Sequence, residues 1–75
     1  MPKLPVVSGK ELIKALQKVG FVFARQRGDH VILKHTDGRV VTIPLKKEIK
    51  KGTLKKGILN PLNISIQELI RLLSK

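Results

Sequence analysis

Apolar residues near the start of the chain recur every three or four positions, which is the spacing of one helical face. These apolar positions are Leu12, Ile13, Leu16 and Val19. Ser8 and Glu11 form a capping box, in which the hydroxyl and the carboxylate each satisfy a free backbone N–H. Because Gly20 is a typical terminator, the pattern predicts a helix from Ser8 to Val19.

Three short runs of strand character follow, at residues 21–25, 30–35 and 39–43. The tetrapeptide QRGD separates the first two runs, and the hairpin-forming pair Asp37–Gly38 lies between the second and the third. Pro44 ends the third run because proline cannot donate a hydrogen bond to a sheet. The pattern predicts three antiparallel strands joined by hairpins.

Helical spacing returns in the last third of the chain. A second helix is predicted from about Gly52 through Leu59, where the pair Asn60–Pro61 breaks it. Ser65 and Glu68 repeat the capping box and begin a third helix. The apolar stripe of this helix consists of Ile66, Leu69, Ile70 and Leu73.

The order of these elements, α-β-β-β-α-α, predicts an α+β fold in which the helices pack on one face of a three-stranded antiparallel sheet. A chain of 75 residues is long enough for one domain with a small core. We therefore expect a single domain over residues 1–75, with residues 1–7 as an N-terminal extension. The side chains expected to be buried are Leu12, Leu16, Val31, Leu33, Ile58 and Leu69.

Positive charge is the main departure from an ordinary composition. Lysine and arginine total 16 against 5 acidic residues, which gives a formal net charge of +11. This excess favours a polyanionic partner, with nucleic acid ahead of an anionic membrane surface or an acidic protein. Since the chain has no Trp or Tyr and only two Phe, binding through phosphates and shape is expected rather than base stacking.

Several classes of protein do not fit the sequence. No apolar stretch approaches the roughly 20 residues of a membrane span, and no signal-peptide core follows Met1, so we expect a soluble, cytoplasmic protein. The absence of cysteine excludes disulfides and thiolate metal sites and fits a reducing compartment. No phosphate-binding glycine loop, carboxylate pair or metal-ligand cluster is present, so proton transfer near pH 7 is left to His30 and His35.

Strand alternation separates the two histidines. Val31 and Leu33 are predicted to face the helices together with His35, which leaves His30 and Lys34 on the open face of the sheet. From spacing alone, His30 is interpreted as a surface histidine beside a turn and His35 as a strand-end residue. A dense group of lysines follows the third strand, and for each of them plain solvation and phosphate contact are equally good interpretations. This group consists of Lys46, Lys47, Lys50, Lys51, Lys55 and Lys56.

Two long segments of the chain, SGKELIKALQKVGFVFARQRGDHVILKH and RVVTIPLKKEIKKGTLKKGIL, resemble the HicA-type toxins, also called the YcfA-like family. The resemblance covers about Ser8 to Leu73. It implies a fold like that of double-stranded-RNA-binding domains and the activity of an mRNA interferase, an endoribonuclease that is the toxin of a type II toxin–antitoxin system. It also implies that the histidine of the Gly-x-His turn is essential, and this histidine is His30. The implied partners are mRNA and a HicB-type antitoxin, which would cover His30 and the basic face.

The chain departs from the family pattern at two positions. Asp29 replaces the serine that usually precedes the histidine, and Lys46 replaces a histidine that often lies two residues after the strand-ending proline. A carboxylate at Asp29 favours the imidazolium form of His30 and so biases it toward the role of an acid. With no clear second group for proton transfer, a slow enzyme is expected.

RNA carries its own nucleophile, the 2′-hydroxyl, so cleavage requires neither a metal ion nor a small-molecule cofactor. The residues expected to bind the RNA phosphates are Arg25, Arg27, Lys34, Lys46, Lys47, Lys50, Lys51 and Lys55. The alternatives are a noncatalytic RNA-binding module of the same fold and a purely architectural or protein-interaction domain. Only the last of these would lack salt-sensitive binding to nucleic acid.

Overall fold

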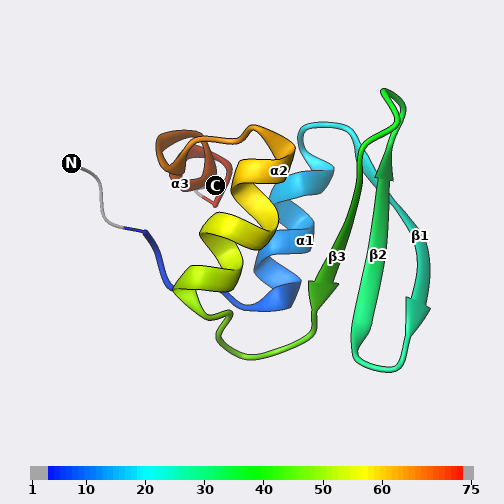
Figure 1. Ribbon diagram of the computed structural model, residues 1–75, viewed down its shortest axis with the longest axis horizontal. Helices are drawn as coiled ribbons and strands as arrows, with labels where there is room; N and C mark the ends of the chain where they lie inside the picture. Colours follow the sequence, from blue (N-terminus) through cyan, green and yellow to red (C-terminus); the bar gives the residue numbers. More distant parts are fainter. Residues whose placement is uncertain (1–3, 74–75) are drawn as a thin grey trace.

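The computed structural model describes residues 4–73. The elements are α1 (Gly9–Gln17), β1 (Phe21–Arg27), β2 (His30–His35), β3 (Val40–Pro44), the π-helix η1 (Thr53–Leu59), α2 (Asn60–Leu62) and α3 (Ile66–Leu73). The strands form one antiparallel sheet in the order β1-β2-β3. The helices lie together on one side of this sheet, and its other face is bare (Figure 1). The predicted α+β fold is therefore confirmed.

The capping signals read from the sequence define where α1 and α3 begin. The Glu11 backbone N–H donates to Ser8 Oγ over 3.1 Å, and the Ser8 N–H donates to Glu11 Oε1 over 3.0 Å. At α3, the Glu68 N–H donates to Ser65 Oγ over 3.1 Å. Both predicted helix starts are confirmed, although α1 ends at Gln17 rather than at Val19.

The prediction that Asn60–Pro61 ends the second helix is wrong. The helix continues from η1 directly into α2 and ends at Leu62 (Figure 1). In an α-helix a proline ring collides with the carbonyl group four residues earlier. Here the turn before the proline is wider, because the Asn60 N–H donates to the carbonyl of Lys55, five residues earlier. The π geometry thus accommodates Pro61 within a continuous helix.

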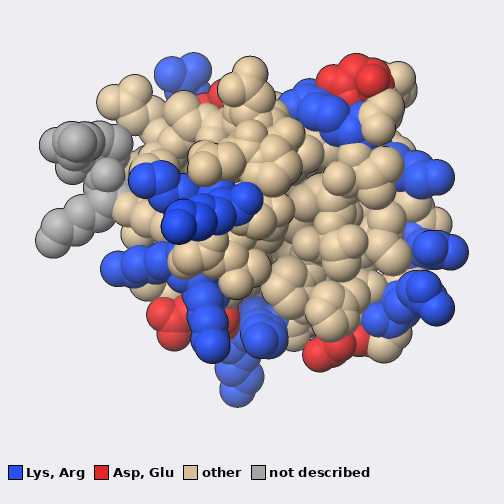
Figure 2. Space-filling model, in the orientation of Figure 1, with Lys and Arg blue, Asp and Glu red and all other residues tan. Residues whose placement is uncertain are grey.

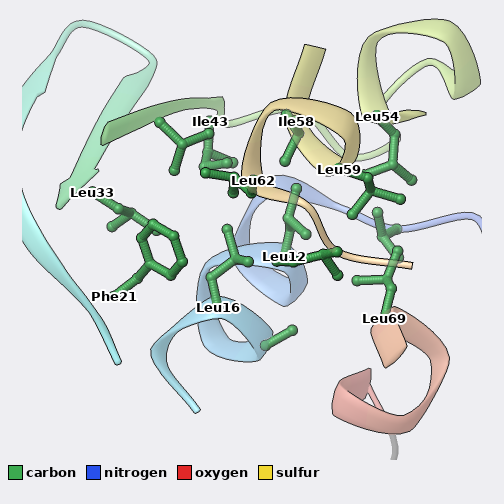
Figure 3. Packing of buried hydrophobic residues seen from close by; sticks show 14 of the residues in the cluster. Leu12, Leu16, Phe21, Leu33, Ile43, Leu54, Ile58, Leu59, Leu62 and Leu69 are labelled. Atoms are coloured by element: carbon green, nitrogen blue, oxygen red, sulfur yellow. The ribbon is translucent and has the colours of Figure 1, made fainter. Parts of the chain in front are cut away.

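The hydrophobic core lies between the helices and the covered face of the sheet (Figure 3). Phe21 and Leu33 extend from the sheet toward Leu12 and Leu16 of α1, while Leu69 closes the core from α3. The six side chains predicted to be buried are all buried: Leu12, Leu16, Val31, Leu33, Ile58 and Leu69. Burial of these apolar side chains is the main stabilising contribution in a domain of this size.

A polar cluster around Arg39 joins the β2–β3 turn to the end of α2. Arg39 Nη1 donates to the Leu62 carbonyl over 2.6 Å, and Arg39 Nε donates to Asp37 Oδ2 over 2.7 Å. The guanidinium carbon also lies 5.2 Å from the centre of the Phe21 ring. The backbone N–H of Arg39 lowers the pKa of Asp37, so the contribution of this carboxylate to stability is present at neutral pH and is lost as the pH falls through the lowered value.

Replacing Arg39 with alanine should destabilise the fold. The substitution leaves the Leu62 carbonyl without its donor, and we expect the free energy of unfolding to fall by about 1–2 kcal/mol. Urea unfolding followed by circular dichroism measures this change. Arg25→Ala is the matched control, because Arg25 is exposed and no hydrogen bond or ion pair holds it within the described part of the chain. Equal stability of the two variants would contradict a structural role for Arg39.

Candidate functional site on the bare face of the sheet

His30 owes its position to the two-residue turn that joins β1 and β2. Arg27 pairs with His30 across this turn, so Gly28 and Asp29 are its two central residues. Gly28 has φ +60, and the positive angle is confined to the first of the two central positions, as in a type II′ hairpin turn. A glycine at this position is what the turn requires, and it makes His30 the first residue of β2.

The bare face is defined by the alternation of β2. Val31 and Leu33 are buried against the helices, whereas the His30 side chain is 55% exposed on the opposite face. Lys34 lies on the same face as His30, four residues further along the strand. The predicted face of His30, Lys34, Val31 and Leu33 is confirmed.

A β-bulge places two arginines beside His30. The β1–β2 pairing shifts by one residue between Phe23 and Arg25, so Ala24 has no partner in β2. Beyond the bulge, Arg25 lies opposite Ile32 and Arg27 lies opposite His30. Opposed residues of an antiparallel pair project on the same face, so both arginines lie on the bare face.

A shallow hollow with a volume of ≈ 450 Å³ lies among these residues. Its lining consists of Arg25, Arg27, His30, Ile32, Val40 and Thr42. Ile32, Val40 and Thr42 are not among the site residues that the sequence predicts, although Ile32 shares its predicted face with His30 and Lys34. Strand alternation indicates the face of these residues. Val40 and Thr42 alternate with the buried Val41 and Ile43 in β3, and Ile32 lies between the buried Val31 and Leu33 in β2.

The electrostatic environment of His30 is set by Asp29 and the two arginines. His30 Nδ1 lies 3.0 Å from Asp29 Oδ1, and both side chains are exposed. A carboxylate at Nδ1 holds a proton on that nitrogen and leaves Nε2 for other partners. Asp29 does not line the hollow, so Arg25 and Arg27 give the lining of the hollow a positive charge. The site therefore combines two arginines with one exposed imidazole, a side chain that serves as a general acid or base in many enzymes.

His35 is part of the structure rather than of this site. It is half-buried, its Nε2 lies 2.9 Å from the Val19 carbonyl oxygen, and its Nδ1 accepts the Asp37 N–H over 3.1 Å. Its ring also meets Phe21 edge-on at 5.0 Å between centroids. These contacts hold the end of β2 against the turn that follows α1, which agrees with the interpretation of His35 as a strand-end residue.

The lysines after β3 lie outside the hollow. Figure 2 shows basic side chains over η1 and the segment that leads into it, and others along the β1 side of the sheet. Lys46 and Lys47 lie in the connector that follows β3. Lys50 and Lys51 lie just before η1, and Lys55 lies within it. All five side chains are exposed, and none lines the hollow that contains His30.

The described residues offer neither a cluster of metal ligands nor a membrane-spanning helix. Over residues 4–73, no three His, Cys, Asp or Glu side chains gather as a metal-binding group. Over the same residues, no helix has the length and apolar character needed to cross a membrane.

The fold and the site together describe a small basic α+β domain that presents a histidine and two arginines on an uncovered sheet face. The family model for the HicA toxin of bacterial toxin–antitoxin systems matches residues 9–59, which is more than half of the chain. The chain belongs to this HicA toxin family, as its sequence predicts, and membership implies an antitoxin as its partner. A search among curated proteins finds no match.

Proposed function

We propose that this protein is the toxin of a type II toxin–antitoxin pair and acts as a metal-independent mRNA interferase. Membership of the HicA family supports the toxin role. The observation that carries the enzymatic proposal is the hollow on the bare face, where an exposed histidine lies with two arginines and no acidic lining residue. The arginines supply positive charge for a phosphodiester group, and His30 supplies the proton.

In the proposed reaction the RNA 2′-hydroxyl loses its proton to solvent water, its oxygen attacks the adjacent phosphorus, and the bond from phosphorus to the 5′-oxygen breaks. The products are a 2′,3′-cyclic phosphate and a 5′-hydroxyl. His30 acts as the acid that protonates the leaving 5′-oxygen from Nε2, while Asp29 accepts a hydrogen bond from Nδ1–H and orients the ring. Arg25 and Arg27 stabilise the negative charge that develops on the phosphate oxygens.

The geometry also supports a second candidate function, that of a noncatalytic RNA-binding module. Within the described residues, the hollow contains no second side chain that exchanges protons near neutral pH. His30 would then bind phosphate together with the arginines, and the chain would protect RNA rather than cut it. A slow enzyme and a binding module therefore differ in one observable, the breakage of the RNA strand.

The test is the incubation of a defined single-stranded RNA with the protein in EDTA, beside a DNA oligonucleotide of the same sequence. We expect the RNA to be cut to products with 2′,3′-cyclic phosphate ends, and the DNA to survive because it lacks the 2′-hydroxyl. An intact RNA that nevertheless binds with steep salt dependence would replace the interferase proposal with the binding module.

The partner that we propose is a HicB-type antitoxin that covers His30 and the surrounding basic face. Acidic groups of the antitoxin would compete with RNA for Arg25, Arg27 and Lys34, whose charges the described part of this chain does not pair. Inhibition by such a protein should therefore weaken as the salt concentration rises.

Neutralising Lys50 and Lys51 together should weaken RNA binding for all sequences. Lysine contacts to phosphate release counterions, so the plot of log K against log salt should become shallower by about one to two units. Fluorescence anisotropy over a salt series measures the slope for wild type and for Lys50→Gln/Lys51→Gln. An unchanged slope would restrict RNA contact to other parts of the surface.

A further inference from the structure

A second hollow lies just past the strand end that pairs with His30. Pro44 is the partner of His30 across the β2–β3 pairing, and Leu45 follows it. The hollow has a volume of ≈ 180 Å³. It is lined by Ser8, Lys10, Leu45, Lys46 and Lys47. Its three charged lining residues are all lysines, and they come from two segments that are far apart in the sequence.

Backbone hydrogen bonds fix this hollow relative to His30. The Gly9 N–H donates to the Lys46 carbonyl over 2.9 Å, which joins the connector after β3 to the start of α1. The Leu45 N–H donates to the Asp29 carbonyl over 2.6 Å, which joins the same connector to the turn that carries His30. The connector that carries Lys46 and Lys47 is therefore bonded both to the turn before His30 and to the start of α1, which carries Lys10.

The lysine charges in this hollow are not neutralised by the described residues. Lys10, Lys46 and Lys47 have no ion pair there. The acidic residues nearest to them in sequence are Glu11 and Glu48, and neither lines the hollow. The Glu11 carboxylate is also engaged in the capping box with the Ser8 N–H. Like charges held close together repel each other, so an anion that binds among them relieves this repulsion.

We propose that this hollow binds a phosphodiester group of the RNA strand that flanks the phosphate at His30. The proposal rests on the proposed function and extends it to a second phosphate subsite, made by Lys10, Lys46 and Lys47. The hollow has room for about six water molecules of liquid volume, which suits one phosphate group with part of its hydration. The RNA then follows a path from the bare face, over the strand end, toward Lys50 and Lys51.

Lys10 gives the sharpest test, because Lys14 lies one turn further along the same helix, is also exposed, and does not line the hollow. The probe is a 2′-O-methyl oligouridine of twelve nucleotides, which the proposed reaction cannot cut. Its affinity is measured over a salt series for wild type, Lys10→Gln, Lys10→Gln/Lys46→Gln and the control Lys14→Gln. Each lost phosphate contact removes about 0.7 from the slope for a single strand.

We expect the slope to fall by about 0.7 for Lys10→Gln and by about 1.4 for the double variant, with Kd values at 0.1 M salt raised about 5-fold and 25-fold. Lys14→Gln should change Kd less than about twofold. Equal behaviour of Lys10→Gln and Lys14→Gln would overturn the subsite. If the oligonucleotide slope stays unchanged while binding of a polyglutamate of similar charge weakens, the hollow serves an acidic protein and the RNA proposal is wrong.

RNA cleavage by the same variants separates this inference from the proposed function. With cleavable RNA, the double variant should show a raised KM and a kcat within about twofold of wild type, since it loses only a contact away from the reacting atoms. A lowered kcat at unchanged KM would place Lys10 and Lys46 at the reacting phosphate and overturn the flanking subsite. A wild type that cuts no RNA would overturn the interferase alone, because the binding comparison does not depend on cleavage.

Discussion

His30→Ala should abolish RNA cleavage and cellular toxicity while the fold and RNA binding remain. The His30 side chain is 55% exposed and lies on the face opposite the core, so its loss should change the free energy of unfolding by less than about 0.5 kcal/mol. Loss of the group that transfers the proton should lower the cleavage rate by about 10²–10⁴-fold. Cleavage of a defined RNA in EDTA and growth of cells that express each variant measure the two effects.

His35→Ala is the matched control for a histidine outside the site. It removes the contacts to the Val19 carbonyl, the Asp37 N–H and the Phe21 ring, so it should lower stability. The protein that remains folded should still cut RNA, because His35 lies on the covered face. Equal cleavage by wild type and His30→Ala would refute the catalytic assignment, provided that circular dichroism shows both proteins to be folded.

Asp29→Ser tests the carboxylate beside His30 in the same assay. The substitution removes the carboxylate oxygen that lies 3.0 Å from His30 Nδ1. It also restores the serine that usually precedes this histidine in the HicA-type pattern. Activity should be kept or raised if the carboxylate is only a modulator. A loss as large as that of His30→Ala would make Asp29 part of the proton-transfer machinery, and the mechanism would then require two residues.

Gly9→Ala should be among the most destabilising substitutions outside the core. A Cβ atom at Gly9 would collide with the Pro44 carbonyl oxygen and would lie 3.0 Å from Leu45 Cα. Both are backbone atoms, so no change of rotamer relieves the contact, and the connector has to move. Overpacking of this kind costs about 1–3 kcal/mol, measured by urea unfolding. Because the connector carries Lys46 and Lys47, RNA affinity should also fall.

Gly57→Ala is the control for the loss of a glycine. The atom nearest to a Cβ at Gly57 is Thr53 Cγ2 at 3.8 Å, an ordinary contact, and alanine favours helix over glycine by about 1 kcal/mol. This variant should therefore be as stable as wild type or slightly more stable. A Gly9→Ala protein of wild-type stability would show that the connector is not held tightly against α1.

The local sequence determines the position and the face of His30 in the candidate site. The turn residue Gly28 fixes His30 as the first residue of β2, and the alternation of Val31 and Leu33 gives its face without reference to the rest of the fold. The capping boxes at Ser8 and Ser65 likewise mark where helices begin. These features depend on residues at most four positions apart, which is why spacing alone predicts them.

The position of the two arginines was decided by pairing between strands. Strict alternation from the buried Phe21 would put Phe23, Arg25 and Arg27 on the covered face. The bulge at Ala24 reverses this for the arginines. Phe23 keeps its alternation and lies opposite Leu33, yet it is 55% exposed. It belongs to an edge strand away from the helices (Figure 1), and periodicity does not reveal how far the helices extend over a sheet.

Contacts between distant segments decided the rest. The sequence places Lys10 on a helix and Lys46 after a strand, and only the bond from the Gly9 N–H to the Lys46 carbonyl brings them to one hollow. The sequence around Pro61 predicts a helix break. The buried side chains of Leu59 and Leu62 on either side of Pro61 instead favour a continuous helix against the core. The sequence thus determined the order of the elements, the face of His30 and the family, whereas long-range packing and strand register determined where the second helix ends and which charged groups surround the histidine.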